Sequence, residues 1–179
     1  MGRPKALVVG DDGRPWLHSA VQALRDGGCT DVVVVLGAAA EEAGRLLGDA
    51  DVTTVVAEDW SEGMSASLRA GLQAARRHLD ERPGATGAVA VSLVDLPDVD
   101  ARVVARVLRA VGTDPAALGR AAYDGEPGHP VVIGVGHLAG VLASMRGDRG
   151  ARDYLRRRDV ALVECADLAT GRDVDRPVP

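Results

Sequence analysis

The chain has 179 residues, of which 46% are hydrophobic and 26% charged, and its formal net charge is −5 at pH 7. This composition excludes a disordered chain and suits one domain spanning residues 1–179. No apolar run reaches the length of about 18 residues that a membrane span needs, and the acidic balance argues against a nucleic-acid binder. Two cysteines, Cys29 and Cys165, are too few for a disulfide framework or a metal knuckle, which favours reduced thiols and a cytoplasmic location.

The first part of the chain alternates between short β-branched runs and amphipathic helical patterns. The runs predict strands at 31–36, 52–56 and 88–94. Apolar stripes at helical spacing predict helices at 17–24, 64–79 and 103–111. This alternation indicates an α/β fold with a mostly parallel sheet and helices on both faces. In such folds the ligand site lies beyond the carboxyl ends of the strands.

After about residue 113 the alternation of apolar strands with long amphipathic helices ends. Two short strands are expected at 119–124 and 131–133, around a turn rich in glycine and proline. Two short helices at 138–145 and 150–158 and a strand at 160–164 then follow. We find no linker, internal repeat or low-complexity segment, so a single domain is predicted.

Asp95 directly follows the predicted strand at 88–94 and is followed by Leu96-Pro97-Asp98. Because the proline terminates the strand, the carboxylate should emerge at the ligand edge of the sheet. A lone aspartate there suits Mg²⁺ bound to a substrate phosphate, since Mg²⁺ takes one or two protein carboxylates together with phosphate oxygens. The alternative is an aspartate that caps a turn or a helix.

The segment Trp60-Ser61-Glu62-Gly63-Met64-Ser65-Ala66-Ser67-Leu68 joins a predicted strand to the long helix. Its serines can cap that helix while free backbone N–H groups face outward. Such a terminus can hold a phosphate or the polar groups of a nucleotide. Capping alone, with Ser61 as a plain N-cap, explains the serines equally well.

The histidines carry little information by themselves. His129, in Gly128-His129-Pro130, lies in the turn rich in glycine and proline, where it could donate to an anionic substrate or be incidental. His18, His78 and His137 fall on helical patterns without a partner at metal-ligand spacing, so we assign them no role. The run Arg156-Arg157-Arg158 is typical of a solvated helix end, where cations meet the helix dipole.

The basic residues are 20 arginines and one lysine, Lys5. Asparagine and phenylalanine are absent, which indicates a GC-rich genome. The single lysine is therefore either left over from this codon bias or retained because it has a function. A compact lysine ammonium suits a phosphate site.

Six segments together resemble a known family. They are Met1-Gly-Arg-Pro-Lys5-Ala-Leu7, Glu62-Gly-Met-Ser-Ala-Ser-Leu-Arg-Ala-Gly-Leu72, Asp95-Leu-Pro-Asp-Val99, Pro127-Gly-His-Pro-Val131, Gly147-Asp-Arg-Gly-Ala-Arg152 and Asp173-Val-Asp175. In this order they resemble the MobA-like nucleoside-triphosphate transferase family, and within it the molybdenum cofactor cytidylyltransferases (MocA-like). Any one of them is weak, but six in register over essentially the whole chain are strong.

The resemblance implies a three-layer, Rossmann-like nucleotidyltransferase fold and a reaction. In that reaction the terminal phosphate of molybdopterin attacks the α-phosphorus of CTP, with Mg²⁺ as cofactor and pyrophosphate as product. Lys5 matches the lysine that contacts the nucleotide phosphates. Asp95 matches the first Mg²⁺ carboxylate, and Asp175 matches the second.

The resemblance also implies binding residues and partners. Gly2, Gly63, Ser65 and Ser67 match segments that line the nucleotide, together with Lys5 and Asp95. Gly128, His129 and Pro130 match a loop on the acceptor side, near the pterin phosphate. The small-molecule partner is molybdopterin, and the candidate protein partner is a xanthine-dehydrogenase-type molybdoenzyme or its chaperone. Neither a nucleic acid nor a membrane is implied.

Two departures from the family pattern shape our expectations. The family begins with a strand and a glycine-rich loop before Met-Gly-x-Pro-Lys, whereas this chain starts at that methionine. We therefore expect a sheet without its first strand, with a gap, and a true start upstream of Met1. The family also continues from Asp-x-Asp into Thr-Pro-Glu-Asp, whereas Asp175 is followed by Arg176-Pro177-Val178-Pro179.

Three functions remain open on these residues. The first is transfer of CMP from CTP to molybdopterin for xanthine-dehydrogenase-type enzymes. The second keeps the fold but uses GTP, or a sugar phosphate or other small phosphorylated acceptor. The third is a non-catalytic protein that binds the cofactor and delivers it to a partner enzyme.

Overall fold

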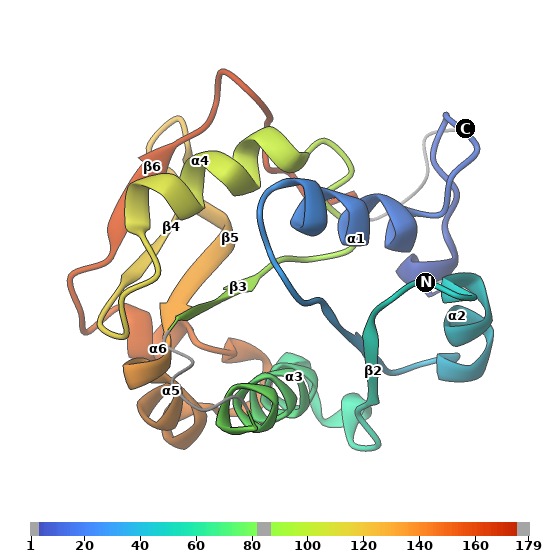
Figure 1. Ribbon diagram of the computed structural model, residues 1–179, viewed down its shortest axis with the longest axis horizontal. Helices are drawn as coiled ribbons and strands as arrows, with labels where there is room; N and C mark the ends of the chain where they lie inside the picture. Colours follow the sequence, from blue (N-terminus) through green and yellow to red (C-terminus); the bar gives the residue numbers. More distant parts are fainter. Residues whose placement is uncertain (1–3, 82–86, 175–179) are drawn as a thin grey trace.

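The computed structural model describes residues 4–81 and 87–174, and the strands within them form two separate sheets (Figure 1). In the smaller sheet, β1 (Val33–Leu36) pairs in parallel with β2 (Thr53–Val56). The larger sheet has the strand order β3-β5-β4-β6. Its strands are β3 (Ala88–Val91), β5 (Glu126–Gly134), β4 (Leu118–Tyr123) and β6 (Ala161–Glu164).

The strand directions confirm the α/β fold with a mostly parallel sheet. β4 and β6 pair in parallel, and both β3 and β4 pair antiparallel with β5. Three strands of the larger sheet therefore run in one direction, and β5 alone runs against them. β5 reverses because it returns from β4 through the tight turn at Asp124–Gly125, where both residues have positive φ.

The two sheets are not hydrogen-bonded to each other within the described residues, so the predicted gap is observed. Residues 5–7 form a short 3-10 helix, η1 (Lys5–Leu7), and Val9 makes one isolated bridge to Pro15. Leu7 is buried in the core around β1, which anchors η1.

The helices follow the predicted order with two differences. They are α1 (Trp16–Asp26), α2 (Ala40–Leu47), α3 (Met64–Asp80), α4 (Ala101–Val111), α5 (Leu138–Ser144) and α6 (Arg152–Leu155). α2 was not predicted, because it is short and buries only Ala43 and Leu47. The helix predicted at 150–158 was too long, because Gly150 has φ +52° and lies outside helical geometry.

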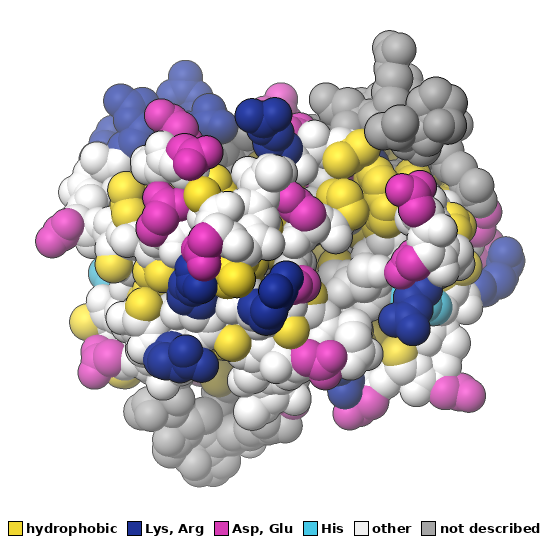
Figure 2. Space-filling model, turned by 90° about the horizontal axis from the view of Figure 1, so that it is seen from above, with side chains coloured by type: hydrophobic (Ala, Val, Ile, Leu, Met, Phe, Trp, Pro, Cys, Tyr) yellow, Lys and Arg dark blue, Asp and Glu magenta, His cyan; other side chains and the backbone are white. Residues whose placement is uncertain are grey.

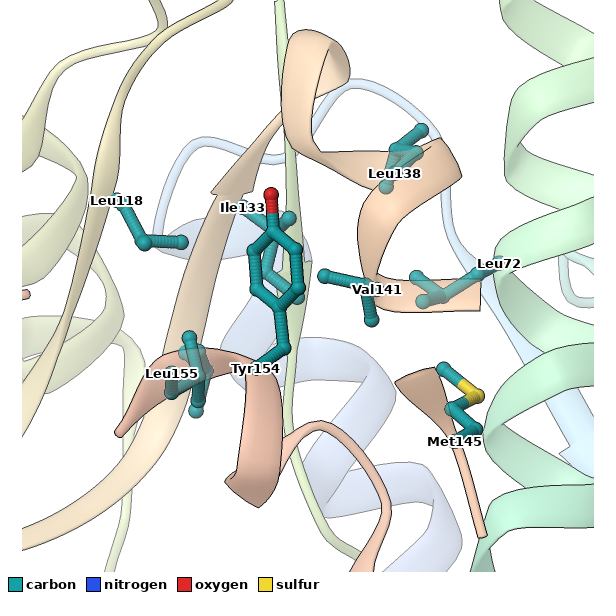
Figure 3. Close-up of a cluster of buried hydrophobic side chains, with 9 residues drawn as sticks. Leu72, Leu118, Ile133, Leu138, Val141, Met145, Tyr154 and Leu155 are labelled. Carbon is teal, nitrogen blue, oxygen red and sulfur yellow. The ribbon is translucent and has the colours of Figure 1, made fainter. Parts of the chain in front are cut away.

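Helices cover both faces of the larger sheet, which divides the core into layers (Figure 1). On one face, side chains from α3, α5 and α6 pack against β4 and β5, with Tyr154 between Leu118 and Val141 (Figure 3). On the other face, α4 buries Val103 and Val107 completely. A third cluster surrounds β1 between α1 and α2. Burying one such aliphatic side chain stabilises the fold by about 1.5–3 kcal/mol.

The surface carries both signs of charge. On the face seen from above, Lys and Arg side chains alternate with Asp and Glu, without a continuous basic patch (Figure 2). Among the residues that the structure describes, none of the helices combines the length and the apolar character needed to cross a membrane.

Candidate active site

Asp95 lies in a turn beyond the carboxyl end of β3, as predicted. The turn is anchored on both sides, because Leu93 packs against the α4 core and Val94 against the core around β1. Leu96 and Val99 are buried immediately after it. The chain therefore holds Asp95 between the core under α4 and the core around β1.

Lys5 and Asp95 form an ion pair, although 90 residues separate them in sequence. Lys5 Nζ lies 2.5 Å from Asp95 Oδ2, and the two side chains are only 25% and 15% exposed. This contact joins η1, which belongs to the core around β1, to the end of β3. The structure thus brings together the two residues predicted to be catalytic.

The C-terminal segment also reaches this turn. The backbone N–H of Val174 donates to the backbone carbonyl of Asp95 at 3.0 Å. Val174 is the middle residue of Asp173-Val174-Asp175, and through this bond the described part of the motif contacts Asp95. Asp173 is exposed, while Asp175 and Gly2 lie outside the described residues.

The donor set around Asp95 fits a cation that a substrate brings with it. Within the described residues, 4–81 and 87–174, no group of three or more His, Cys, Asp or Glu side chains lies close enough together to hold a metal ion. Asp95 offers one carboxylate, and Lys5 engages its Oδ2. One or two carboxylates with phosphate oxygens are the usual environment of Mg²⁺.

The segment before α3 differs from the serine-capped terminus that we expected. Gly63 is the N-cap residue, with φ +115° and without a side-chain cap. Asp148, 84 residues away, supplies the cap instead, because its Oδ1 accepts a hydrogen bond from Met64 N at 3.1 Å. A Cβ at Gly63 would collide with the Asp148 carboxylate, so both the backbone angle and the close approach require glycine.

Ser65 is buried, with 3% of its surface exposed. Its Oγ accepts a hydrogen bond from Gly150 N at 3.1 Å, which fixes the turn after η4 (Gly147–Arg149) to the start of α3. Ser67 is partly exposed one half-turn further along. The nucleotide-binding roles of Gly63, Ser65 and Ser67 stay predictions, with Ser65 tied to this structural contact.

The segment Gly128–Pro130 lies in β5 and is held by two side chains of β4. Arg120 Nε donates to Gly128 O at 2.9 Å, and Tyr123 OH donates to His129 O at 2.7 Å. Burial, assisted by the charge of Arg120, lowers the pKa of His129 to about 4, while the charge of Asp95 acts in the opposite direction. His129 is therefore neutral at pH 7 and close enough to both groups to feel their charges.

The remaining histidines have structural surroundings. His137 contacts Tyr154 OH through Nδ1 at 2.9 Å and Ala116 O through Nε2 at 3.1 Å. The arginine run follows the end of α6, and the guanidinium of Arg158 stacks 3.5 Å from the centre of the Tyr154 ring. The helix end predicted there is confirmed.

The sequence assigned no role to two polar residues that hold these segments, namely Arg120 and Asp148. Asp148 belongs to the segment Gly147–Arg152, whose resemblance to the family was the available signal. Arg120 had none, because a strand arginine looks solvent-exposed until its partners are known.

The fold is that of an α/β protein with a partly buried lysine–aspartate pair beyond the end of β3. The MobA-like NTP transferase domain family matches residues 1–162. The chain belongs to this family and is a nucleotidyltransferase of MobA-like type.

Known proteins resemble the chain over most of its length. The chain is 37% identical to nicotine blue oxidoreductase of Paenarthrobacter nicotinovorans, over 98% of this chain and 85% of that protein. It is similar to Rv0371c of Mycobacterium tuberculosis H37Rv, with 26% identity, a TM-score of 0.73 and coverage of 92% and 80%. A structure of Rv0371c in complex with manganese matches at 25% identity with a TM-score of 0.70, covering 90% and 81%. A nucleotidyl transferase from Methanothermobacter shares the fold at 20% identity, with a TM-score of 0.70 and coverage of 90% and 74%.

Proposed function

We propose that the protein transfers CMP from CTP to the terminal phosphate of molybdopterin and releases pyrophosphate. The observation that carries this proposal is the Lys5–Asp95 pair, which joins two predicted catalytic residues at the sheet edge. The proposed setting is the cytoplasm, and the proposed recipient of the product is a xanthine-dehydrogenase-type molybdoenzyme or its chaperone.

The chemistry needs charge neutralisation more than a strong base. An oxygen of the acceptor phosphate forms a bond to the α-phosphorus, and the bond from that phosphorus to the β-phosphate oxygen breaks. The electron pair of the broken bond leaves with pyrophosphate. Because the nucleophile is already ionised, positioning and electrostatic stabilisation carry the rate.

Lys5 can supply part of that stabilisation from a partly buried position. Its ammonium pairs with Asp95. We expect it to bind a phosphate oxygen of the nucleotide when the carboxylate holds Mg²⁺. A Mg²⁺ held by Asp95, and by Asp175 as we propose, would neutralise phosphate charge. The manganese complex of Rv0371c supports a divalent cation in this family.

The decisive test measures pyrophosphate release from CTP and from GTP, each with and without molybdopterin and Mg²⁺. We expect release with CTP that depends on the acceptor and on Mg²⁺. Release with GTP, or with another phosphorylated acceptor, would favour the second function considered above. The absence of release together with molybdopterin binding would favour a carrier.

Asp95→Asn is the matched variant for this assay. It should fold and lower turnover by about 100-fold or more, as the loss of one electrostatic stabiliser does. Asp49→Asn removes an exposed carboxylate after α2 and should leave turnover unchanged. Near-normal turnover of Asp95→Asn would contradict the role of Asp95.

A second candidate activity comes from the name of one relative. Nicotine blue oxidoreductase is 37% identical over 98% of this chain, so an oxidoreductase is the alternative. The test is decolorisation of nicotine blue with NADH or NADPH as the electron donor. Oxidation of the nicotinamide without pyrophosphate release in the first assay would favour this candidate.

A further inference from the structure

The tail of the described chain, residues 169–174, has neither helical nor strand structure, yet it is fixed near both of its ends. Near the first end, Thr170 binds the side chain of Asp98. At the other end, Val174 N donates to Asp95 O at 3.0 Å. Asp95 and Asp98 both lie in the short segment between β3 and α4, so this one segment holds the tail at two points.

The contact between Asp98 and Thr170 is a double hydrogen bond to a carboxylate. Asp98 Oδ2 accepts from both Thr170 N and Thr170 Oγ1, each at 2.6 Å. Hydrogen bonds to a charged acceptor are about twice as strong as neutral ones. The other oxygen, Asp98 Oδ1, is buried and has no hydrogen-bond partner among the described residues. The bonds from Thr170 therefore offset the cost of desolvating this carboxylate, and the pair forms a clamp on the tail.

The middle of the tail lies tightly against Tyr123 of β4. Gly171 has φ +61°, and a Cβ at this position would collide with the Tyr123 ring. The Thr170 hydroxyl also accepts a hydrogen bond from Arg172 N at 3.4 Å, which supports the bend at Gly171. Ala169, just before the clamp, is buried in the same core cluster as Tyr123. These contacts fix the register of the tail, because it cannot slide past the ring toward or away from Asp95.

We propose that Asp98 is a positioning residue for the metal site, in an inference that rests on the proposed function. By holding Thr170, it keeps the end of the tail at Val174 against Asp95. Asp175, the second metal carboxylate in our proposal, directly follows Val174 in the sequence. Groups that orient metal ligands from outside the coordination sphere usually change metal affinity by about 10–100-fold when they are lost. Asp98 thus sets the affinity for the cation through the tail, without contacting the cation.

Titration with Mn²⁺ in the presence of CTP, followed by electron paramagnetic resonance, tests the clamp without turnover. A parallel series with GTP makes the result independent of the nucleotide that the transferase uses. Asp98→Ala should weaken Mn²⁺ binding by about tenfold or more. Thr170→Val should weaken it by about three- to tenfold through the loss of one hydrogen bond, and Thr170→Ser should bind as the wild type does. Thr170 is exposed, so its variants keep the test valid even if Asp98→Ala does not fold.

Asp114→Ala is the matched control. Asp114 Oδ1 also accepts a backbone hydrogen bond, from Ala116 N at 2.8 Å, but in the turn before β4. This variant should bind Mn²⁺ as the wild type does. Mn²⁺ binding by folded Thr170→Val and Asp98→Ala that is as tight as in this control would overturn the proposal. The absence of Mn²⁺ binding by the wild type with either nucleotide would overturn it as well.

Trypsin cleavage after the exposed Arg172 separates positioning from direct coordination. Asp98→Ala should raise the rate of this cleavage by about tenfold or more, because the tail opens more often once both hydrogen bonds to the carboxylate are lost. Weakened Mn²⁺ binding with cleavage at the wild-type rate would make Asp98 a metal ligand and overturn its positioning role. Mn²⁺ binding and cleavage that both depend on Asp98, without pyrophosphate release in the turnover assay, would leave the clamp standing and refute the proposed transferase reaction instead.

Discussion

The ion pair between Lys5 and Asp95 links the first described residues to the end of β3, so its strength can be measured as a coupling energy. The perturbation is a double-mutant cycle of Lys5→Met, Asp95→Asn and the double variant. A cycle subtracts whatever else each side chain does and leaves the interaction between the two. It therefore reports on this pair even where each residue has further contacts.

The expected magnitude follows from burial. Exposed ion pairs contribute about 0.2–1 kcal/mol, and breaking a fully buried pair costs about 3–5 kcal/mol. With 25% and 15% of the side chains exposed, this pair falls between these limits. We expect a coupling of about 1–2 kcal/mol, since solvent still screens part of the attraction. Asp95→Asn alone should cost about 2 kcal/mol because the ammonium loses this anionic partner.

Urea unfolding followed by circular dichroism is the assay. With a slope of about 2 kcal/mol per molar, Asp95→Asn should lower the midpoint by about 1 M at an unchanged slope. Arg76 and Asp80 form the control pair, which is 54% and 71% exposed with 3.7 Å between its charged atoms. Its coupling should stay below about 0.5 kcal/mol. A Lys5–Asp95 coupling as small as that of the control would refute the reasoning.

Three further predictions concern the surroundings of the site. Gly63→Ala should cost about 2–4 kcal/mol by thermal unfolding, because the new methyl group meets Asp148 at a positive φ. Gly13→Ala, also at positive φ but with open space, should cost only about 1 kcal/mol, and equal losses would refute the predicted collision. Ser65→Ala should cost about 1–2 kcal/mol, since a buried backbone N–H loses its acceptor; an unchanged unfolding temperature would contradict this contact. The pKa of His129 is about 4 in the folded protein and about 6.5 in the unfolded chain, so the unfolded chain takes up this proton first as the pH falls. The free energy of unfolding should therefore be highest above pH 6.5 and fall towards pH 4, by at most about 3.4 kcal/mol from this group. His129→Gln should lose correspondingly less stability between urea titrations at about pH 7 and about pH 4.5; an equal loss in both proteins would contradict the lowered pKa.

Local patterns in the sequence predicted most of the elements. The periodicity of apolar residues marks a helix or a strand without knowledge of its neighbours, so α1, α3, α4 and most strands were found close to their observed bounds. The strand expected at 131–133 was too short, because β5 begins at Glu126 and includes the glycine and proline residues that were expected to form a turn. The position of Asp95 was predictable because Pro97 must interrupt a strand that ends in an apolar run. Lys5 became a candidate through the family resemblance, and the structure then placed it beside Asp95.

Contacts between distant segments depended on the tertiary structure. The sequence predicted that nearby serines cap α3, but the hydrogen bond from Met64 N is accepted by Asp148, which is 84 residues away in the sequence. The order and type of the elements were thus determined by the sequence itself, because backbone propensity and apolar spacing act over a few residues. The composition of the site was decided by tertiary packing, because charges interact through space once the chain has brought them together.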